Sequence, residues 1–315
     1  MQMSKKIFVT GATGFIGSKF VQHAVKAGYR LRVLSRNLDE FRNEDFIEVY
    51  QGDLTGGADW SEALSGVDVV VNAAGEIRHN DLMQSTNFDE PLRLFNASVK
   101  AGVRRWVQLS SVGAYGRFRK GVIDESWNDS PVGLYEKTKS DFDLALMEAS
   151  TASSIDFCIL RPSNVYGHGM RAQSIYEMLN VIRKGQFAFI GPEGPSANYV
   201  HVDDVAHAIL LCVSNHNAAN QIYIVSAWAT IEDMVSGLAE GAGYKAPSRR
   251  IPFPLAKGLA SFVKIWPKWP LTTSRVQALS SRSQYSTGKI ERELCWKCTV
   301  PVKEGMRQFA KRSHK

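Results

Sequence analysis

The chain has 315 residues, of which 44% are hydrophobic and 22% charged, and its formal net charge at pH 7 is +7. A chain of this length and composition can bury a full core, either as one large domain or as a large domain with a smaller companion. The positive charge is modest and shows no basic face interleaved with aromatic residues, so we expect no nucleic-acid partner.

The sequence shows no segment for export or membrane insertion. Only six residues precede the first predicted strand, which leaves no room for a signal peptide, and no apolar run approaches the length that spans a bilayer. We therefore expect a cytoplasmic location. Cys295 and Cys298 form one C-x-x-C pair without a second pair or a nearby histidine. We expect incidental thiols there, and neither a disulfide framework nor a metal site.

The first predicted strand, Ile7–Thr10, runs directly into a turn with the spacing G-x-x-G-x-x-G, formed by Gly11, Gly14 and Gly17. A predicted helix, Gly14–Ala27, follows. Glycines at these positions permit a tight turn, let the backbone approach a pyrophosphate, and pack the helix against the strand. The phosphates then lie on the free N–H groups and the positive dipole end of the helix. The strand–turn–helix context predicts a dinucleotide-binding site.

The rest of the first half alternates strands with helices. Buried apolar strands separated by helices predict βαβ units, and hence an α/β fold with a doubly wound parallel (Rossmann) sheet. The predicted strands are Leu31–Ser35, Ile47–Gln51, Val67–Asn72, Arg105–Ser110 and Phe157–Arg161, and the predicted helices are Trp60–Leu64, Asp89–Ala101 and Leu134–Ser150.

After about residue 162 the pattern loosens into helices, short strands and turns rich in Pro and Gly. We expect residues 1–165 to form the dinucleotide-binding domain and residues 166–315 a smaller substrate-binding portion, of which roughly 199–225 crosses back to the main sheet. The segment Ile251–Leu271 is apolar, aromatic and basic. Because prolines interrupt it, we expect a packed substrate lid or a dimer face rather than membrane contact.

Tyr135 and Lys139 are spaced i, i+4, so both side chains leave one face of the predicted helix. An ammonium near a phenol favours the phenolate and lowers the pKa of the tyrosine, which can then exchange a proton with a substrate oxygen. The spacing alone is common on surface helices. Ser111, however, follows the predicted strand Arg105–Ser110, at the edge where open α/β sheets bind ligands. It can donate a hydrogen bond to the same substrate oxygen.

Seven motifs together resemble the extended short-chain dehydrogenases/reductases, in the NAD-dependent epimerase/dehydratase/reductase branch. Their order and spacing match that family over nearly the whole chain. The motifs are T-G-A-T-G-F-I-G (10–17), G-D-L (52–54), N-A-A-G (72–75), S-S-x-x-x-Y-G (110–116), Y-x-x-x-K (135–139), R-P-S-N-V-Y-G (161–167) and Y-V-H-V-D-D-V-A (199–206).

The resemblance implies a catalytic triad of Ser111, Tyr135 and Lys139. It also implies that Ser111, Asn164 and Tyr166 bind the substrate, although Asn164 could instead cap a turn and Tyr166 could instead pack. Asp203 matches an aspartate that ties the C-terminal part to the main domain. The expected cofactor-binding residues are Gly11, Thr13, Gly14, Phe15, Ile16, Gly17, Arg36, Asp53, Leu54, Asn72, Ala73, Ala74, Gly75, Tyr135, Lys139, Pro162, Asn164 and Val165.

The end of the second predicted strand bears on the choice of cofactor. NAD-binding proteins place a carboxylate there to hold the ribose hydroxyls, whereas an arginine accommodates a 2′-phosphate. Here Arg36 follows Ser35, and no acidic residue occurs before Asp39. The sequence therefore favours NADP over NAD. The alternative is that Arg36 points to solvent or stacks on adenine while NAD binds.

Two departures from the family narrow the reaction. The sugar 4,6-dehydratases that resemble this chain carry an Asp-Glu pair just after the catalytic hydroxyl residue, whereas this chain has Val112 and Gly113. We therefore expect no dehydration. Many nucleotide-sugar members also hold a diphosphate with an arginine that is missing from the run 196–199. Arg171, Arg183 and Arg275 are candidate substitutes, and the sequence does not choose among them.

The leading hypothesis is an NAD(P)-dependent oxidoreductase or epimerase that transfers a hydride at a secondary alcohol or ketone of a nucleotide sugar. The reaction would be 4-keto reduction or epimerisation. The missing arginine and the aromatic 251–271 segment favour an alternative, a ketoreductase or hydroxy-dehydrogenase of a steroid-like or flavonol-like carbonyl. A non-catalytic NADP-binding module is a third reading, against which the intact triad argues. The substrate, the direction and the oligomeric state stay open, and the resemblance allows a homodimer.

Overall fold

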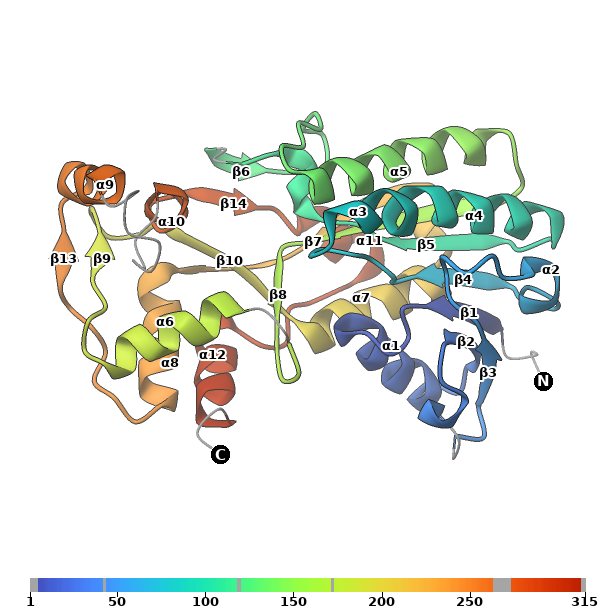
Figure 1. The fold of residues 1–315 in the computed structure, drawn as a ribbon, viewed down its shortest axis with the longest axis horizontal. Coiled ribbons are helices and arrows are strands. Elements are labelled where there is room, and N and C mark those ends of the chain that lie inside the picture. Colours follow the sequence, from blue (N-terminus) through green and yellow to red (C-terminus); the bar gives the residue numbers. More distant parts are fainter. Residues whose placement is uncertain (1–4, 42–43, 118–119, 171–172, 263–272, 313–315) are drawn as a thin grey trace.

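The computed structural model describes residues 5–41, 44–117, 120–170, 173–262 and 273–312 (Figure 1). Its centre is a seven-stranded sheet with the order β11-β7-β5-β4-β1-β2-β3, in which all neighbours pair in parallel. The predicted α/β fold with a doubly wound parallel sheet is therefore confirmed. The strands are β1 (Lys6–Thr10), β2 (Arg30–Ser35), β3 (Ile47–Gln51), β4 (Val69–Asn72), β5 (Arg105–Leu109), β7 (Asp156–Pro162) and β11 (Gln221–Val225).

Helices cover both faces of this sheet (Figure 1). Ile7 and Val9 of β1 join one buried cluster, whereas Phe8 between them joins a cluster on the opposite face. Alternate side chains of a strand thus meet apolar partners on both sides, which is why the strands read as unbroken apolar runs. The first face carries α1 (Phe15–Lys26), α7 (Val202–Ser214) and α11 (Gly288–Leu294), and the second carries α2 (Trp60–Ala63), α3 (Asn80–Gln84), the π-helical turn η2 (Ser85–Asp89), α4 (Glu90–Lys100) and α5 (Leu134–Thr151).

A second, smaller portion extends from the carboxyl ends of the strands (Figure 1). A three-stranded sheet with the order β12-β10-β8 lies in it, and α6, α8 and α12 contribute to one buried apolar cluster. Its elements are β8 (Asn164–Tyr166), α6 (Gln173–Arg183), β9 (Phe189–Ile190), β10 (Ser196–His201), β12 (Ala227–Thr230), α8 (Ile231–Gly241), β13 (Arg250–Ile251), α9 (Phe253–Phe262), α10 (Thr273–Ala278) and α12 (Val302–Arg312).

The chain passes between the two portions more often than the sequence suggested. Within 199–225, β10 belongs to the small sheet, whereas α7 and β11 belong to the large one. A later return was not expected, because Ile290 and Leu294 of α11, together with Trp296, pack in the cluster of the large sheet. The remaining elements are η1 (Leu38–Phe41), η3 (Val112–Tyr115), β6 (Gly121–Ile123), η4 (His216–Ala218) and β14 (Ser283–Tyr285), which pairs with β6.

Two expectations from the sequence concern membrane contact and the segment Ile251–Leu271. In the part of the chain that the structure describes, no helix is long and apolar enough to cross a membrane. Of the segment Ile251–Leu271, residues 263–271 lie outside the described residues.

The strand order reverses between β1 and β4, and open α/β sheets bind ligands at the carboxyl ends of strands at such a point. The fold therefore directs attention to the loops that follow these two strands.

Candidate active site

The glycine turn after β1 packs against the loop after β4. Gly11 has φ +67°, and a Cβ built on it would lie 2.6 Å from the backbone nitrogen of Ala74. A Cβ on Gly17 would lie 2.0 Å from the carbonyl oxygen of Gly11. Neither position admits a side chain. The helix that begins after this turn, α1, has no side-chain cap and no acidic residue in its first turn. Its free N–H groups fit the pyrophosphate of a dinucleotide.

The other predicted cofactor-binding residues of this turn differ in exposure. Thr13 and Gly14 are exposed, whereas Phe15 and Ile16 are half-buried. The N–H of Gly14 donates to the carbonyl oxygen of Gly11 at 2.9 Å. The structure thus brings together the glycine turn and Ala73–Ala74, two segments that the sequence assigned separately to the cofactor.

Arg36 and Asp53, which follow β2 and β3, form a second part of the predicted cofactor site. The guanidinium Nη1 lies 3.7 Å from the Asp53 carboxylate, and the arginine side chain is 83% exposed. Asp53 also accepts a hydrogen bond from the N–H of Thr55 at 3.1 Å, and Leu54 is buried. The guanidinium is therefore accessible to a ligand phosphate, with one carboxylate beside it.

Ser111, Tyr135 and Lys139 come from two elements that pack against each other, η3 and α5. Ser111 caps η3, and its Oγ accepts from the N–H of Gly113 at 3.0 Å. Tyr135 lies in the first turn of α5 and is half-buried, whereas Lys139 is 3% exposed. A Cβ on Gly75 would lie 4.0 Å from Lys139 Nζ. The lysine is thus set beside the N-A-A-G loop that follows β4.

Burial dominates the titration of both groups on α5. It raises the pKa of the Tyr135 phenol to about 12, and the carboxylates of Glu136 and Asp143 add to the rise. Burial also lowers the pKa of Lys139 to about 8, against the opposing effect of Asp143. Desolvation penalises the charged form of each group, so the pKa of Tyr135 is raised rather than lowered as the sequence predicted.

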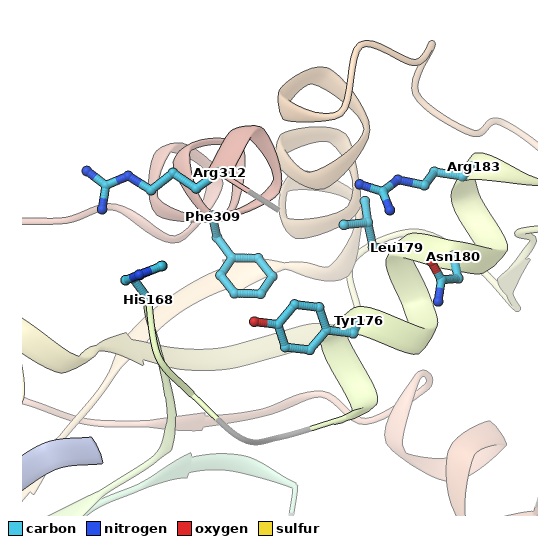
Figure 2. A pocket seen from close by; sticks show the side chains of 7 residues that line it. All are labelled: His168, Tyr176, Leu179, Asn180, Arg183, Phe309 and Arg312. Carbon is cyan, nitrogen blue, oxygen red and sulfur yellow. The ribbon is translucent and has the colours of Figure 1, made fainter. Parts of the chain in front are cut away.

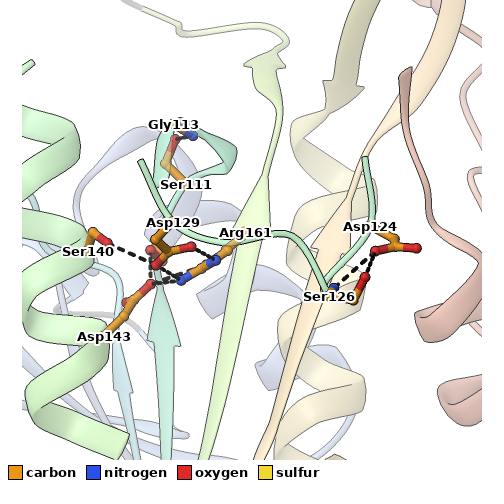
Figure 3. A network of polar contacts seen from close by, with 9 residues as sticks. Ser111, Gly113, Asp124, Ser126, Asp129, Ser140, Asp143 and Arg161 are labelled. Carbon is orange, nitrogen blue, oxygen red and sulfur yellow. Dashed lines mark hydrogen bonds and ion pairs between the residues drawn. The ribbon is translucent and has the colours of Figure 1, made fainter. Parts of the chain in front are cut away.

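An ion-pair network joins β7 to α5 (Figure 3). Arg161 of β7 makes two contacts with Asp129, at 2.7 and 2.8 Å, and donates to Asp143 of α5 at 3.2 and 3.3 Å. Ser110 Oγ donates to Asp143 at 2.6 Å, and Ser140 Oγ donates to Asp129 at 3.0 Å. The network joins the residue before Ser111 to the helix that carries Tyr135 and Lys139.

Asn87, in the π-helical turn η2, is a residue that the sequence analysis missed. Its side chain accepts from the N–H of Glu76 at 2.8 Å and donates to the Glu76 carbonyl at 3.0 Å and to Thr138 Oγ1 at 3.1 Å. It therefore ties the loop after β4 to α5 next to Lys139. The loop is also fixed by Asn72, whose amide donates to Gln108 at 2.9 Å. No local pattern in the sequence points to Asn87, because its contacts depend on how η2 packs on α5.

The predicted site residues at the end of β7 and just after it differ in burial. Asn164 is exposed and donates to the carbonyl of Asn198 at 3.1 Å, Val165 is half-buried, and Pro162 is buried. Tyr166 is fully buried, and a Cβ on Gly305 of α12 would lie 1.9 Å from its hydroxyl. The expectation that Tyr166 binds substrate does not fit this geometry, which supports the alternative that the ring packs.

The acidic residue that the fold brings beside Ser111 is Glu136. A Cβ on Gly113 would lie 2.6 Å from Glu136 Cγ and 3.3 Å from Ser111 Oγ. The Glu136 carboxylate pairs with Arg117 at 2.9 Å. By contrast, Asp124 accepts from Ser126 (Figure 3), and Glu125 accepts from the N–H of Ile224 at 2.8 Å.

A separate cavity of about 200 Å³ lies between α6 and α12 (Figure 2). None of the predicted catalytic or cofactor-binding residues lines it, although Arg183, a candidate diphosphate ligand, does. Arg171 and the side chain of Arg275 lie outside the described residues. The lining residues are His168, Tyr176, Leu179, Asn180, Arg183, Phe309 and Arg312.

Comparisons with known proteins bear on the family and the fold. The model of the NAD dependent epimerase/dehydratase family matches residues 7–226. A UDP-glucose 4-epimerase of Vibrio cholerae is 24% identical and covers 98% of this chain and 95% of its own. The isoform 2 3beta-hydroxysteroid-dehydrogenase/decarboxylase of Arabidopsis thaliana is 26% identical, over 86% of this chain and 53% of its own. The fold is similar to that of a UDP-glucuronic acid 4-epimerase from Bacillus cereus solved with NAD, with a TM-score of 0.77, 18% identity, and 98% and 100% coverage of the two chains.

Proposed function

Because the chain belongs to the NAD dependent epimerase/dehydratase family, and is thus an NAD(P)-dependent oxidoreductase or epimerase, we propose that it transfers a hydride at a secondary alcohol or ketone of a nucleotide sugar. The reaction is a 4-keto reduction or an epimerisation. The observation that supports hydride transfer at this site is the position of Lys139 Nζ, 4.0 Å from a Cβ built on Gly75, and similarity to a UDP-glucose 4-epimerase supports the nucleotide sugar. The position of Lys139 places the Tyr-x-x-x-Lys helix against the loop that meets the glycine turn.

The residues have distinct roles in this proposal. The glycine turn and the start of α1 hold the pyrophosphate, and Lys139 donates to the ribose of the nicotinamide. Ser111 orients the substrate oxygen, and Tyr135 transfers the proton to or from it. When bound, the nicotinamide accepts or supplies the hydride. A phenol with a pKa near 12 is protonated at neutral pH, and this is the form that reduction of a ketone requires.

A second candidate is a ketoreductase or hydroxy-dehydrogenase of a steroid-like or flavonol-like carbonyl. The run 196–199 in β10, where the arginine that would hold a diphosphate is missing, reads Ser-Ala-Asn-Tyr and contains no cation. Similarity to the Arabidopsis hydroxysteroid dehydrogenase also favours this reading. Ser111, Tyr135 and Lys139 are all present in this chain, so we do not propose a non-catalytic module.

Product analysis distinguishes the two candidates. The purified protein is incubated with UDP-hexoses, their 4-keto derivatives and steroid ketones, each with NADPH, NADH, NADP or NAD. Turnover of the sugar nucleotides alone supports the first proposal, and turnover of the steroid ketones alone supports the second. The nucleotide that the purified protein retains adds a further distinction, because tightly held NAD is typical of an epimerase and exchangeable NADPH of a reductase.

We propose NADP as the preferred cofactor and predict that Arg36→Ala weakens NADPH binding much more than NADH binding. The expected loss is about 1.5–3 kcal/mol, or about 10- to 150-fold in Kd, for one charge-assisted bond to the 2′-phosphate. Fluorescence titration of both cofactors measures it. Arg30→Ala is the matched control, because this exposed arginine lies at the opposite end of β2. Equal losses for NADPH and NADH in Arg36→Ala would contradict the proposed contact.

We also predict that the enzyme does not dehydrate a nucleotide hexose. Elimination of water needs a carboxylic acid that protonates the leaving hydroxyl. Val112 and Gly113 have no such group, and the carboxylate of Glu136 is paired with Arg117 at 2.9 Å. Mass spectra should therefore show products with an unchanged oxygen count. Loss of one water from an intact nucleotide hexose would refute the prediction, and its disappearance in Glu136→Gln would identify the acid.

A further inference from the structure

Asp143 is a fully buried carboxylate on the same face of α5 as Lys139, one helical turn further along. Its Oδ2 accepts from Ser110 Oγ at 2.6 Å and from Arg161 at 3.2 and 3.3 Å. Its Oδ1 is also buried and has no hydrogen-bond partner within the described residues. Ser110 and Arg161 therefore bind only Oδ2, and the negative charge of the carboxylate is not fully accounted for by these two partners.

The charges around it balance when Asp143 is ionised, a form that Arg161, Ser110 and Lys139 favour against the effect of burial, which raises its pKa. Arg161 and Lys139 are each 3% exposed and contribute two positive charges. Asp129, which pairs with Arg161 through both oxygens, and Asp143 contribute two negative charges. If Asp143 were neutral, Asp129 would balance Arg161 and the Lys139 ammonium would stand uncompensated in a buried position. Buried charges are strongly destabilised without an opposite charge.

We propose that Asp143 is a positioning residue that holds Lys139 in its charged form and links it, through Ser110, to the end of β5 that carries Ser111. The inference rests on the proposed function only for the role of Lys139 in hydride transfer. The charge interaction itself is a property of the protein without substrate.

The electrostatics of α5 agree with this role. Asp143 raises the pKa of Lys139 against the effect of burial, and it also raises the pKa of Tyr135. Glu136 acts on Tyr135 from the same helix, and Asp129 pairs with the Arg161 guanidinium.

Other elements packed on α5 contribute no further charge at this point. The carboxylates of Asp81 in α3 and Asp89 in η2 are exposed, and Glu90 of α4 pairs with Arg93. Toward α5, η2 presents the neutral Asn87, which donates to Thr138. From η3, the neutral ring of Tyr115 lies under the Arg161 guanidinium, with its centroid 4.8 Å away.

NMR titration of protein labelled with ¹³C at the lysine ε carbons tests the proposal. Lys139 should titrate near its pKa of about 8, apart from the exposed lysines, and its signal is assigned by its loss in Lys139→Gln. In Asp143→Asn the midpoint should fall by about 1–2 pH units, because the opposite charge one turn away is removed. Asp143→Ser is a second neutral variant that places no amide donor against Arg161.

Asp129→Asn is the matched control, because it also removes a carboxylate that pairs with Arg161, but not the one that lies one helical turn from Lys139 on α5. Its midpoint, and that of Asp143→Glu, should stay near the wild-type value. An unchanged midpoint in the folded neutral variants at Asp143 would overturn the proposal. An equal fall of the Lys139 midpoint in Asp129→Asn would overturn it as well. The shift would then come from disturbing the ion-pair network as a whole rather than from the charge of Asp143.

The pH profile of kcat supplies a second readout. Loss of Asp143 lowers the pKa values of both Tyr135 and Lys139, so the profile of Asp143→Asn should move to lower pH as a whole. A merely structural role would lower kcat at every pH without moving the profile. The NMR midpoint needs no substrate, so a failure to find any turnover would count against the proposed function and leave the test of Asp143 intact.

Discussion

Tyr135→Phe is expected to lower turnover by about 10²- to 10⁴-fold, the usual contribution of a positioned general acid or base. The substitution removes the only group on the aromatic ring that can exchange a proton, and it keeps the ring in the first turn of α5. Folding and cofactor affinity should therefore stay near their wild-type values. The measurements are kcat with the best substrate of the panel, cofactor titration and far-UV circular dichroism.

A second tyrosine supplies the control for this experiment. Tyr176 is exposed and lines the separate cavity between α6 and α12, so Tyr176→Phe should leave turnover unchanged. Near-normal turnover in Tyr135→Phe would eliminate Tyr135 as the acid or base. A comparable loss in both variants would mean that the phenols act on stability rather than on the chemistry.

Local patterns were sufficient to predict the main sheet. The run Val67–Asn72 is continuously apolar, as expected for a strand of a sheet that is covered on both faces. The strand β4 occupies Val69–Asn72 within it. The helix predicted at Leu134–Ser150 is α5, Leu134–Thr151. The glycine turn was recognisable because its spacing has a physical requirement that the structure makes visible at Gly11 and Gly17. In each case the pattern that predicts the element is local in the sequence, although Gly11 makes its close contact with the distant Ala74.

Contacts between distant segments could not be read in this way. The side chain of Glu136 takes the space beside Gly113, and the hydroxyl of Tyr166 lies against Gly305 of α12. Neither contact follows from a motif, because each depends on how two elements dock. The pKa of Tyr135 was misjudged for a related reason. The sequence showed the nearby ammonium of Lys139, whereas burial, which has the larger effect, exists only in the folded protein.

Arg161→Met is expected to lower the free energy of unfolding by about 3–5 kcal/mol, the cost of removing one partner from a buried ion pair. The substitution removes the cation that pairs with both Asp129 and Asp143, and Asp143 is fully buried. Urea unfolding at pH 7 measures the loss. Arg93→Met is the control, because this arginine is 70% exposed and pairs with Glu90 at 3.4 Å, so its loss should stay below about 1 kcal/mol.

The pH dependence of this loss has a definite sign. Burial already raises the pKa of Asp143, and the charge of Arg161 opposes the rise. Without Arg161 the folded-state pKa lies further above the unfolded value, so the ionised carboxylate destabilises the fold at neutral pH. The penalty fades as the pH falls through the folded-state pKa. The deficit of Arg161→Met should therefore be smaller at pH 5 than at pH 8, and adding Asp143→Asn should recover part of it at pH 8. A deficit that is equal at both values and is not recovered would mean that Arg161 stabilises the fold by packing rather than by its charge.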